Sequence, residues 1–298
     1  MLGYIKSPLN YTGGKYKLLS TIMPSFPANT NNFVDLFTGG MNVAINADAK
    51  TIYANDQIDY LMELYEYFQN TDTAEIIKSI KETISIYALD LQNVDGYNKL
   101  RNDYNNKKNP LALFVLTCFA FNHQIRFNNS FQFNTPFGKD RSCYNSSIES
   151  NLIRFSTALK EKNILLSSND FREFDFSVLE KGDFVYCDPP YLITTGSYND
   201  GKRGFGDWTQ EEDSALLSLL DQFNSKGIKF ALSNVFYHKG NTNEELIKWS
   251  ENYHVEYLDK KYSNCSYHFK DRDAKTVEVL VTNYEWENRT WQQLELEI

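Results

Sequence analysis

Short apolar runs, each followed by polar or glycine residues, recur near both ends of this sequence. Runs of this length are typical of buried parallel strands rather than of long amphipathic helices. The expected strands are residues 32–37, 51–54, 164–166, 184–187, 229–233 and 277–282. A helical crossover at residues 41–49 and a helix at residues 210–224 would separate successive strands. This order predicts an α/β fold with a doubly wound, Rossmann-like sheet.

The pattern changes between residues 60 and 160, where apolar positions recur three and four residues apart. That spacing predicts helices at residues 60–68, 73–91 and 110–121. The segment that follows alternates polar and aromatic residues, which predicts a hairpin-like projection.

We therefore expect a catalytic domain made of two separate stretches of the chain, interrupted by a mostly helical insert. The catalytic domain would be residues 1–59 and 161–286, the insert residues 60–160 with a β-hairpin at 123–138, and residues 287–298 an acidic tail.

The composition is ordinary for a globular protein, with 42% hydrophobic and 23% charged residues among 298. The net charge of −9 argues against nucleic acid as a partner, although a local basic groove is compatible with it. The longest apolar run, residues 111–121, is too short to cross a bilayer, so no membrane partner is expected. Four cysteines without a CxxC pair argue against a zinc knuckle and favour a reducing cytoplasm.

The tetrapeptide Asp188-Pro189-Pro190-Tyr191 directly follows an expected strand. Ligands bind at the C-terminal edge of open α/β sheets. The two prolines stiffen the turn and direct the Asp188 carboxylate outward, while Tyr191 adds an aromatic face. This combination suits a planar amino group, and a tight turn with an acidic cap is the purely structural alternative.

A glycine-rich segment near the N-terminus carries a second set of candidates. Gly13 and Gly14 expose backbone N–H groups before an expected helix, and Lys15 adds a positive charge suited to a carboxylate or a phosphate. The segment is not a Walker loop, because Leu9 and Tyr16 stand where that motif requires glycine and a hydroxyl residue. A plain turn before a helix is the alternative.

Acidic residues lie near the end of, or shortly after, three of the expected strands. Residues 35–40 (Asp-Leu-Phe-Thr-Gly-Gly) form a glycine turn, and Asp56 follows the next strand, where an acid can bind ribose hydroxyls. Asp170 beside Phe171 could hold an adenine amino group and stack on its ring. A helix N-cap at Asp170 explains that pair equally well.

In combination these motifs resemble the Dam-like, D12 class of DNA adenine-N6 methyltransferases, in the order of its alpha group. Residues 11–15 are similar to the N-terminal cofactor motif of that family and residues 37–40 to its FxGxG motif. Residues 188–191 are identical to its catalytic tetrapeptide. Met41 departs from the pattern, because the family often has a third glycine there. Weaker similarities cover residues 126–138, 232–234 and 281–284, so the resemblance extends over about residues 6–286.

The resemblance implies S-adenosylmethionine as cofactor, with no metal, and a flipped-out adenine of double-stranded DNA as substrate. It implies catalytic roles for Asp188, Pro189, Pro190 and Tyr191. It implies cofactor contacts for Tyr11, Gly13, Gly14, Lys15, Asp35, Phe37, Gly39, Asp56, Asp170, Phe171 and Asp188. Strand spacing independently supports Asp56 alone among them.

DNA readout is expected from the hairpin, whose polar side chains can bond base edges or phosphates. The candidates are Arg126, Asn128, Asn129, Gln132 and Asn134. Phe127 or Phe131 could enter the stack that the flipped base leaves, and the alternative for both is the hairpin's own core. Tyr198 or Phe205 could close over the flipped base.

Other functions remain open at this stage. A methyltransferase acting on an RNA base or a protein amide would use a similar turn, and a catalytically silent DNA-binding subunit would keep the fold. A nicotinamide dehydrogenase fits the glycine turn but leaves residues 188–191 unexplained. For the leading hypothesis we expect a bacterial or phage-infected cell, with a restriction endonuclease acting separately as a further candidate partner.

Overall fold

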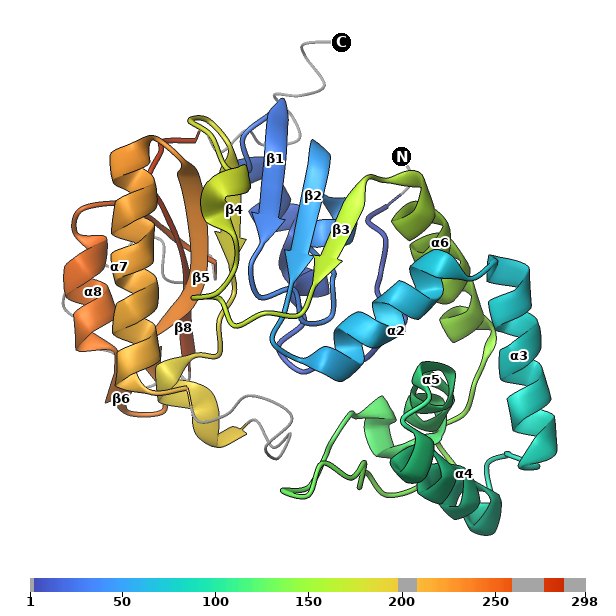
Figure 1. Cartoon of the computed structure of the whole chain (residues 1–298). Helices are drawn as coiled ribbons and strands as arrows, with labels where there is room; N and C mark the ends of the chain where they lie inside the picture. The colour runs from blue at the N-terminus through green and yellow to red at the C-terminus, as the bar shows by residue number, and fades with distance from the viewer. Residues whose placement is uncertain (1–2, 198–207, 259–275, 287–298) are drawn as a thin grey trace.

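The computed structural model describes residues 3–197, 208–258 and 276–286 (Figure 1). Tyr198, Phe205 and the expected tail at residues 287–298 lie outside these ranges. Within them, eight strands form one sheet in the order β3-β2-β1-β4-β5-β8-β7, with β6 paired to β5. The strands are β1 (Thr30–Asp35), β2 (Ala49–Asn55), β3 (Ile164–Ser167), β4 (Phe184–Cys187), β5 (Lys229–His238), β6 (Asn241–Thr242), β7 (His254–Tyr257) and β8 (Thr276–Thr282).

Five neighbouring strands, from β3 to β5, run parallel, and β8 pairs antiparallel with both β5 and β7. The Rossmann-like methyltransferase sheet expected from the sequence is therefore confirmed. All four residues of β4 are buried, which explains why its sequence is continuously apolar. Strand order reverses between β1 and β4, and in such sheets that switch point is where ligands bind.

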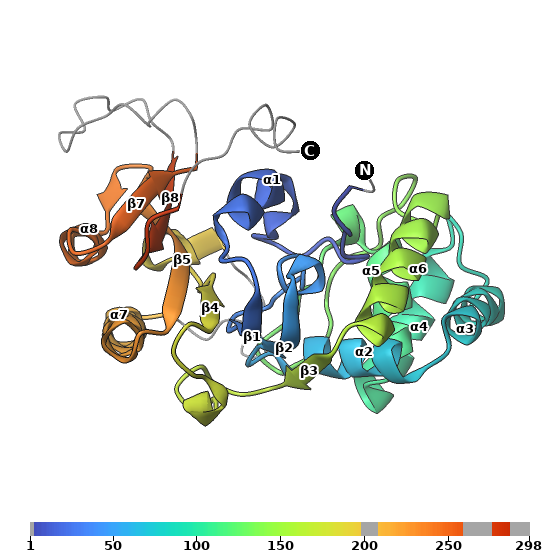
Figure 2. The same cartoon turned by 90° about the horizontal axis from the view of Figure 1, so that it is seen from above.

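Helices cover both faces of the sheet and form a separate group beyond its β3 edge (Figure 2). In that view α1 (Leu19–Ile22) lies on one side of the sheet and α7 (Gln210–Lys226) on the other. The remaining helices are α2 (Asp59–Asn70), α3 (Thr73–Ile86), α4 (Val94–Lys107), α5 (Pro110–Phe119), α6 (Ser146–Glu161) and α8 (Glu244–Ser250).

One continuous apolar cluster joins the sheet to the helical group. It runs from Phe33 and Ile52 on the strands through Tyr60 of α2 to Phe114 of α5 and Phe127. Burying side chains of this size is the main favourable term in folding. The shared core fixes the helical group relative to the C-terminal edge of the sheet.

The helical crossover expected at residues 41–49 is wrong, because only a single 3-10 turn, Ala44–Asn46, is present. Polar side chains bind the backbone here and replace a helical ladder. Asn42 Oδ1 accepts from Ser7 N at 3.0 Å, and Asn46 Oδ1 accepts from Ile5 N at 2.8 Å. The crossover is thereby held by the N-terminal segment.

The expected hairpin at residues 123–138 is an irregular loop closed by two isolated antiparallel bridges, Ala120–Phe137 and Phe127–Phe133. Besides these bridges, a side chain of helix α4 binds the backbone of Phe133. Asn105 of that helix accepts from Phe133 N at 2.7 Å and donates to Phe133 O at 3.1 Å. The side-chain amide of Asn105 thus replaces a neighbouring strand.

Candidate active site

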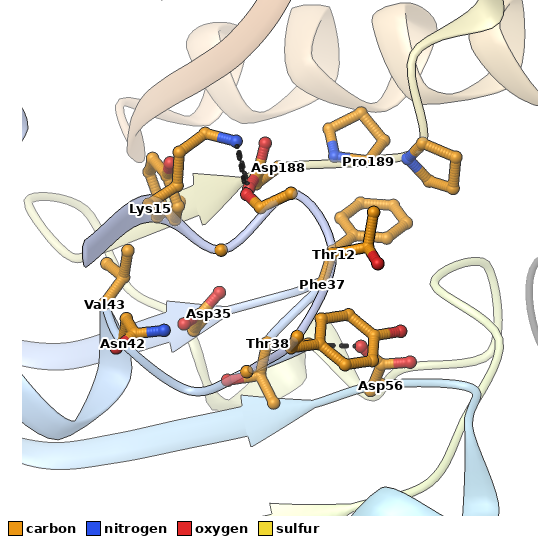
Figure 3. Close-up of a pocket in the computed structure, with 17 residues that line it drawn as sticks. Thr12, Lys15, Asp35, Phe37, Thr38, Asn42, Val43, Asp56, Asp188 and Pro189 are labelled. Carbon is orange, nitrogen blue, oxygen red and sulfur yellow. Dashed lines mark hydrogen bonds and ion pairs between the residues drawn. The ribbon is translucent and has the colours of Figure 1, made fainter. Parts of the chain in front are cut away.

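A pocket lies at the switch point, where the C-terminal ends of β1 and β4 meet the loop of residues 11–15 (Figure 3). Eleven of the residues expected from the sequence line it. They are Tyr11, Gly13, Gly14, Lys15, Asp35, Phe37, Gly39, Asp56, Asp188, Pro189 and Pro190. Segments that are far apart in the sequence therefore form one site, as their positions at strand ends predicted.

The Asp188 carboxylate is held at both oxygens. Lys15 Nζ lies 2.7 Å from Asp188 Oδ2 (Figure 3). The Tyr191 hydroxyl donates to Asp188 Oδ1 at 2.9 Å. Lys15 also lies 5.1 Å from the centre of the Tyr191 ring, and both side chains are buried. An ionised carboxylate has about four lone-pair sites, so Asp188 can still accept further hydrogen bonds. The expected contact of Lys15 with a cofactor carboxylate stays a prediction.

Asp35 ends β1 with its carboxylate in the pocket (Figure 3). Its Oδ2 accepts from Ala44 N at 3.0 Å, whereas its buried Oδ1 has no hydrogen-bond partner. Burial raises the pKa of Asp35 to about 7, against the lowering effect of the Thr38 hydroxyl and of Ala44 N, and the nearby charges of Asp188 and Asp56 add to the rise. A buried oxygen without a partner is costly unless a ligand satisfies it.

Asp56 follows β2 and supports the glycine turn. Its Oδ2 accepts from Gly39 N at 2.8 Å, and its Oδ1 accepts from Ile58 N at 3.0 Å. Burial raises the pKa of Asp56 to about 6. Tyr65 of α2 donates to Gly39 O at 2.7 Å. The turn is thus fixed at both its N–H and its carbonyl group.

The close approach of Tyr11 explains the two glycines of this turn. A Cβ at Gly39 or Gly40 would lie 3.0 Å from side-chain atoms of Tyr11. The next residue, Met41, has a φ of +55° although it is not glycine. The left-handed backbone that glycine adopts without strain is therefore formed here by Met41 at a cost in strain, while its side chain is buried in the core.

Asp170 and Phe171 are not among the residues that line the pocket. Arg172 binds both oxygens of the Asp170 carboxylate, at 2.8 and 2.7 Å, and lowers its pKa. The Phe171 ring is 5.5 Å from that of Phe37, which does line the pocket. Any contact of Asp170 with a cofactor requires that it share its carboxylate with Arg172.

The five expected DNA-binding residues share one exposed or half-exposed loop, and some of their polar atoms are already used. Asn128 Oδ1 accepts from Ser130 N and from Gln132 N, both at 3.0 Å, so its carbonyl builds the turn. Arg126 Nε donates to Asn134 Oδ1 at 3.2 Å. Asn129 is exposed at the tip of the loop.

The aromatic residues of this loop divide into two kinds. Phe127 and Phe133 are buried, and the Phe127 ring lies 4.6 Å from that of Tyr60. Phe131 is 43% exposed, and its carbonyl accepts from Lys108 Nζ at 2.8 Å. Phe127 therefore belongs to the core of the protein, which was the alternative to a role in DNA binding. Phe131 is the aromatic residue of this loop that is available to a partner.

Comparison with known proteins identifies the family. The family model described as D12 class N6 adenine-specific DNA methyltransferase matches residues 11–266. The chain belongs to this family. The resemblance seen in the sequence motifs is thereby confirmed.

Several methyltransferases with curated names are similar to this chain. Modification methylase StsI of Streptococcus sanguinis is 50% identical over 95% of the chain, and type II methyltransferase M.FokI of Planomicrobium okeanokoites is 48% identical over 94%. The match covers 43% of each of these two relatives, so the chain spans less than half of their length. DNA adenine methylase of Salmonella typhi is 26% identical over 76% of the chain and 79% of its own length.

The sequence motifs did not identify several residues of the site. Thr12, Thr38, Asn42, Val43 and Tyr186 also line the pocket. Thr12 and Thr38 lie inside recognised motifs but were not singled out as contacts, and Asn42, Val43 and Tyr186 lie two or three residues outside one. No helix in the described part of the chain is long and apolar enough to span a membrane.

Proposed function

We propose that this chain transfers a methyl group from S-adenosylmethionine to the N6 amine of an adenine in duplex DNA. The observation that carries the proposal is the position of Asp188, which opens into the same pocket as Asp35 and Asp56. Membership of the adenine-specific family supports the reaction and the DNA substrate.

The charge of the pocket supports this choice of methyl donor. Three carboxylates, from Asp35, Asp56 and Asp188, face one ammonium group, from Lys15. S-adenosylmethionine carries an ammonium and a sulfonium, and the unpartnered Oδ1 of Asp35 suits the ammonium. The anionic pyrophosphate of a nicotinamide dinucleotide would meet like charges here, which argues against the dehydrogenase alternative.

The proposed mechanism activates a weakly nucleophilic amine. Asp188 and a carbonyl of the proline turn accept hydrogen bonds from the two N6–H groups, which favours a tetrahedral nitrogen with a directed lone pair. After that nitrogen has gained the methyl group, it releases one of its two protons through Asp188 to solvent. Tyr191 and Lys15 hold the Asp188 carboxylate in the required orientation. The bound methyl donor supplies an activated methyl group on sulfur. Positioning and preorganised charge then account for most of the lowering of the barrier.

A paired adenine cannot enter this pocket, so the base must be flipped out of the duplex. We propose that the loop of residues 126–134 reads the flanking sequence through Arg126, Asn129, Gln132 and Asn134. Phe131 is the exposed aromatic residue that can fill the space the base leaves. Asn128 contributes its side-chain N–H₂ group, because its oxygen is used within the loop.

Arg126→Ala should weaken specific DNA binding and leave cofactor binding unchanged. If Arg126 contacts a guanine, the loss should be about 1–3 kcal/mol and confined to one base pair of the site. If it contacts a phosphate, all duplexes should weaken together and the salt dependence should fall. Fluorescence anisotropy with a set of single-substitution duplexes distinguishes the two, and no change in either would remove Arg126 from the interface.

Asp56→Asn should weaken S-adenosylmethionine binding about tenfold, since one charged acceptor for ribose hydroxyls is lost. The variant keeps one carbonyl oxygen for Gly39 N or Ile58 N, so the fold should survive. Titration calorimetry measures the affinity. Asp59→Asn, on the exposed start of α2, is the matched control. An affinity equal to that of the control would show that Asp56 is structural only.

A filter-binding assay with labelled methyl donor tests the proposed reaction against its alternatives. Mixed-sequence duplex DNA, RNA and protein are offered as separate acceptors. Label on DNA alone supports the proposal, label on RNA or protein supports the other methyltransferases, and DNA binding without label supports a silent subunit. We also propose a restriction-modification setting, since relatives bear the names of modification methylases.

A further inference from the structure

A second cavity adjoins the candidate active site and uses the loop of residues 11–15 as a common wall. Tyr191 lines it from the turn of residues 188–191. Its opposite wall comes from β5 and β8, through Val235, His238, Thr276 and Glu278. No step of the mechanism above uses these four residues.

A β-bulge brings His238 into this cavity. In a regular strand, residues three apart such as Val235 and His238 lie on opposite faces. Both line the cavity here, because Val235 pairs with Glu278 and Tyr237 with Val277, so Phe236 is an extra residue in β5. Bulges near active sites commonly redirect a side chain at a cost in strand pairing. The redirected His238 is then fixed by the contact of its Nδ1 with Thr276 Oγ1 at 2.8 Å.

Cationic side chains are concentrated around this cavity although the chain has a net charge of −9. Lys6 and Lys17 line it, both largely exposed, and Lys15 contributes its side chain from the shared loop. Glu278 is the single carboxylate among the described residues that line it. Lys15 is paired with Asp188, so Lys6, Lys17 and His238 are the groups that can meet an anion here.

We propose that this cavity is a subsite for a DNA phosphodiester next to the flipped nucleotide. The inference rests on the proposed function, which brings the target base to Asp188 and Tyr191. A base at Tyr191 remains attached to its sugar and phosphates, and the adjoining cavity presents donors for a phosphate oxygen. His238 donates through its remaining ring nitrogen, and Lys6 and Lys17 add positive charge. The subsite holds the extruded backbone and leaves sequence readout to the loop of residues 126–134.

The test compares DNA affinity and its salt dependence for His238→Ala and Lys17→Ala. Matched controls are His254→Ala on β7 and Lys248→Ala on α8, both exposed and outside the cavity. The probe is a 20-base-pair duplex that carries the site found by sequencing modified bases in DNA from cells expressing the protein. Each subsite variant should raise the Kd about three- to tenfold, and Lys17→Ala, which removes a positive charge, should also reduce the salt slope by roughly one. S-adenosylmethionine affinity should not change.

Two further measurements make the assignment specific. Glu278→Gln should lower the Kd for DNA, whereas the subsite variants raise it, because this substitution removes a negative charge beside the phosphate. A methylphosphonate placed singly at each phosphate around the target adenine removes one negative charge at a time. At one flanking position the effect of His238→Ala should disappear.

Equal affinities for His238→Ala and His254→Ala would overturn the subsite. A His238→Ala effect that persists with every methylphosphonate, or a Glu278→Gln variant that binds DNA more weakly, would overturn it as well. These results are separate from a failure of the proposed function. If wild-type protein methylates the duplex while His238→Ala binds normally, only the subsite is wrong.

Discussion

Asp188→Ala should abolish methyl transfer while leaving the fold and most DNA binding in place. In the proposed mechanism Asp188 is the carboxylate that meets the target amine, and Lys15 and Tyr191 contact it at 2.7 and 2.9 Å. Loss of one preorganised polar contact to a transition state costs on the order of 10²–10³ in rate. The loss should be larger here, because Asp188 also positions the base. Single-turnover methylation with saturating cofactor and DNA measures the chemical step.

Tyr191 variants separate two roles in the same assay. Tyr191→Phe keeps the ring and loses the hydrogen bond to Asp188, so its rate should fall less than that of Asp188→Ala. Tyr191→Ala should also lose about 1–3 kcal/mol of stacking on the flipped base. Asp188→Ala with a near wild-type single-turnover rate would contradict the proposed mechanism.

Asp35→Asn should weaken S-adenosylmethionine binding and stabilise the free protein. The carboxylate is buried with one unpartnered oxygen, so it favours a bound cation and disfavours the empty fold. Loss of a charged hydrogen bond costs about 1.5–3 kcal/mol, or roughly ten- to a hundredfold in affinity. Asparagine keeps an acceptor for Ala44 N, so the β1 turn should persist.

The stability change should depend on pH with a defined sign. The pKa of Asp35 is about 7 in the folded protein and near 3.8 when unfolded, so the folded state binds its proton more tightly. Its contribution to stability is therefore fully present below pH 4 and is lost as the pH rises to about 7. Urea unfolding measures the free energy of unfolding of both proteins. The difference in favour of Asp35→Asn should grow by at least about 1 kcal/mol as the pH rises from about 4 to about 7. A pH-independent difference would contradict the buried-carboxylate account.

The motifs at the strand ends were predictable from the sequence because geometry determines their location. Parallel strands end at one edge, so Asp35, Asp56 and Asp188 had to come together once their strands were recognised. Short apolar runs also marked β1 to β5 and β8. β5 was expected to end five residues too early, because the polar residues Ser233 and Asn234 interrupt its apolar run although both are buried in the strand.

The sequence pattern did not predict two helices that have few apolar residues. Helix α4 buries Tyr97, Leu100 and Tyr104, which have helical spacing but are surrounded by polar residues. Helix α6 similarly has a narrow apolar face. The expected helix at residues 73–91 ends at Ile86, where Ala88 adopts a φ of +48°. Such termini depend on tertiary contacts that local sequence does not contain.

The details of the site were less predictable than its location. The ion pair of Lys15 with Asp188 joins residues that are 173 positions apart, and no local pattern encodes it. Nor does the sequence around Asp170 reveal that Arg172 binds its carboxylate from two residues away. Both contacts depend on side-chain orientation, which the fold determines.

Identification of the methylated nucleoside tests the central claim most directly. Wild-type protein is incubated with duplex DNA and S-adenosylmethionine labelled in its methyl group, and the DNA is digested to nucleosides for mass spectrometry. We expect label in N6-methyldeoxyadenosine and its loss with Asp188→Ala. Label in a methylated cytosine, or no transfer to DNA by the wild-type protein, would contradict the account.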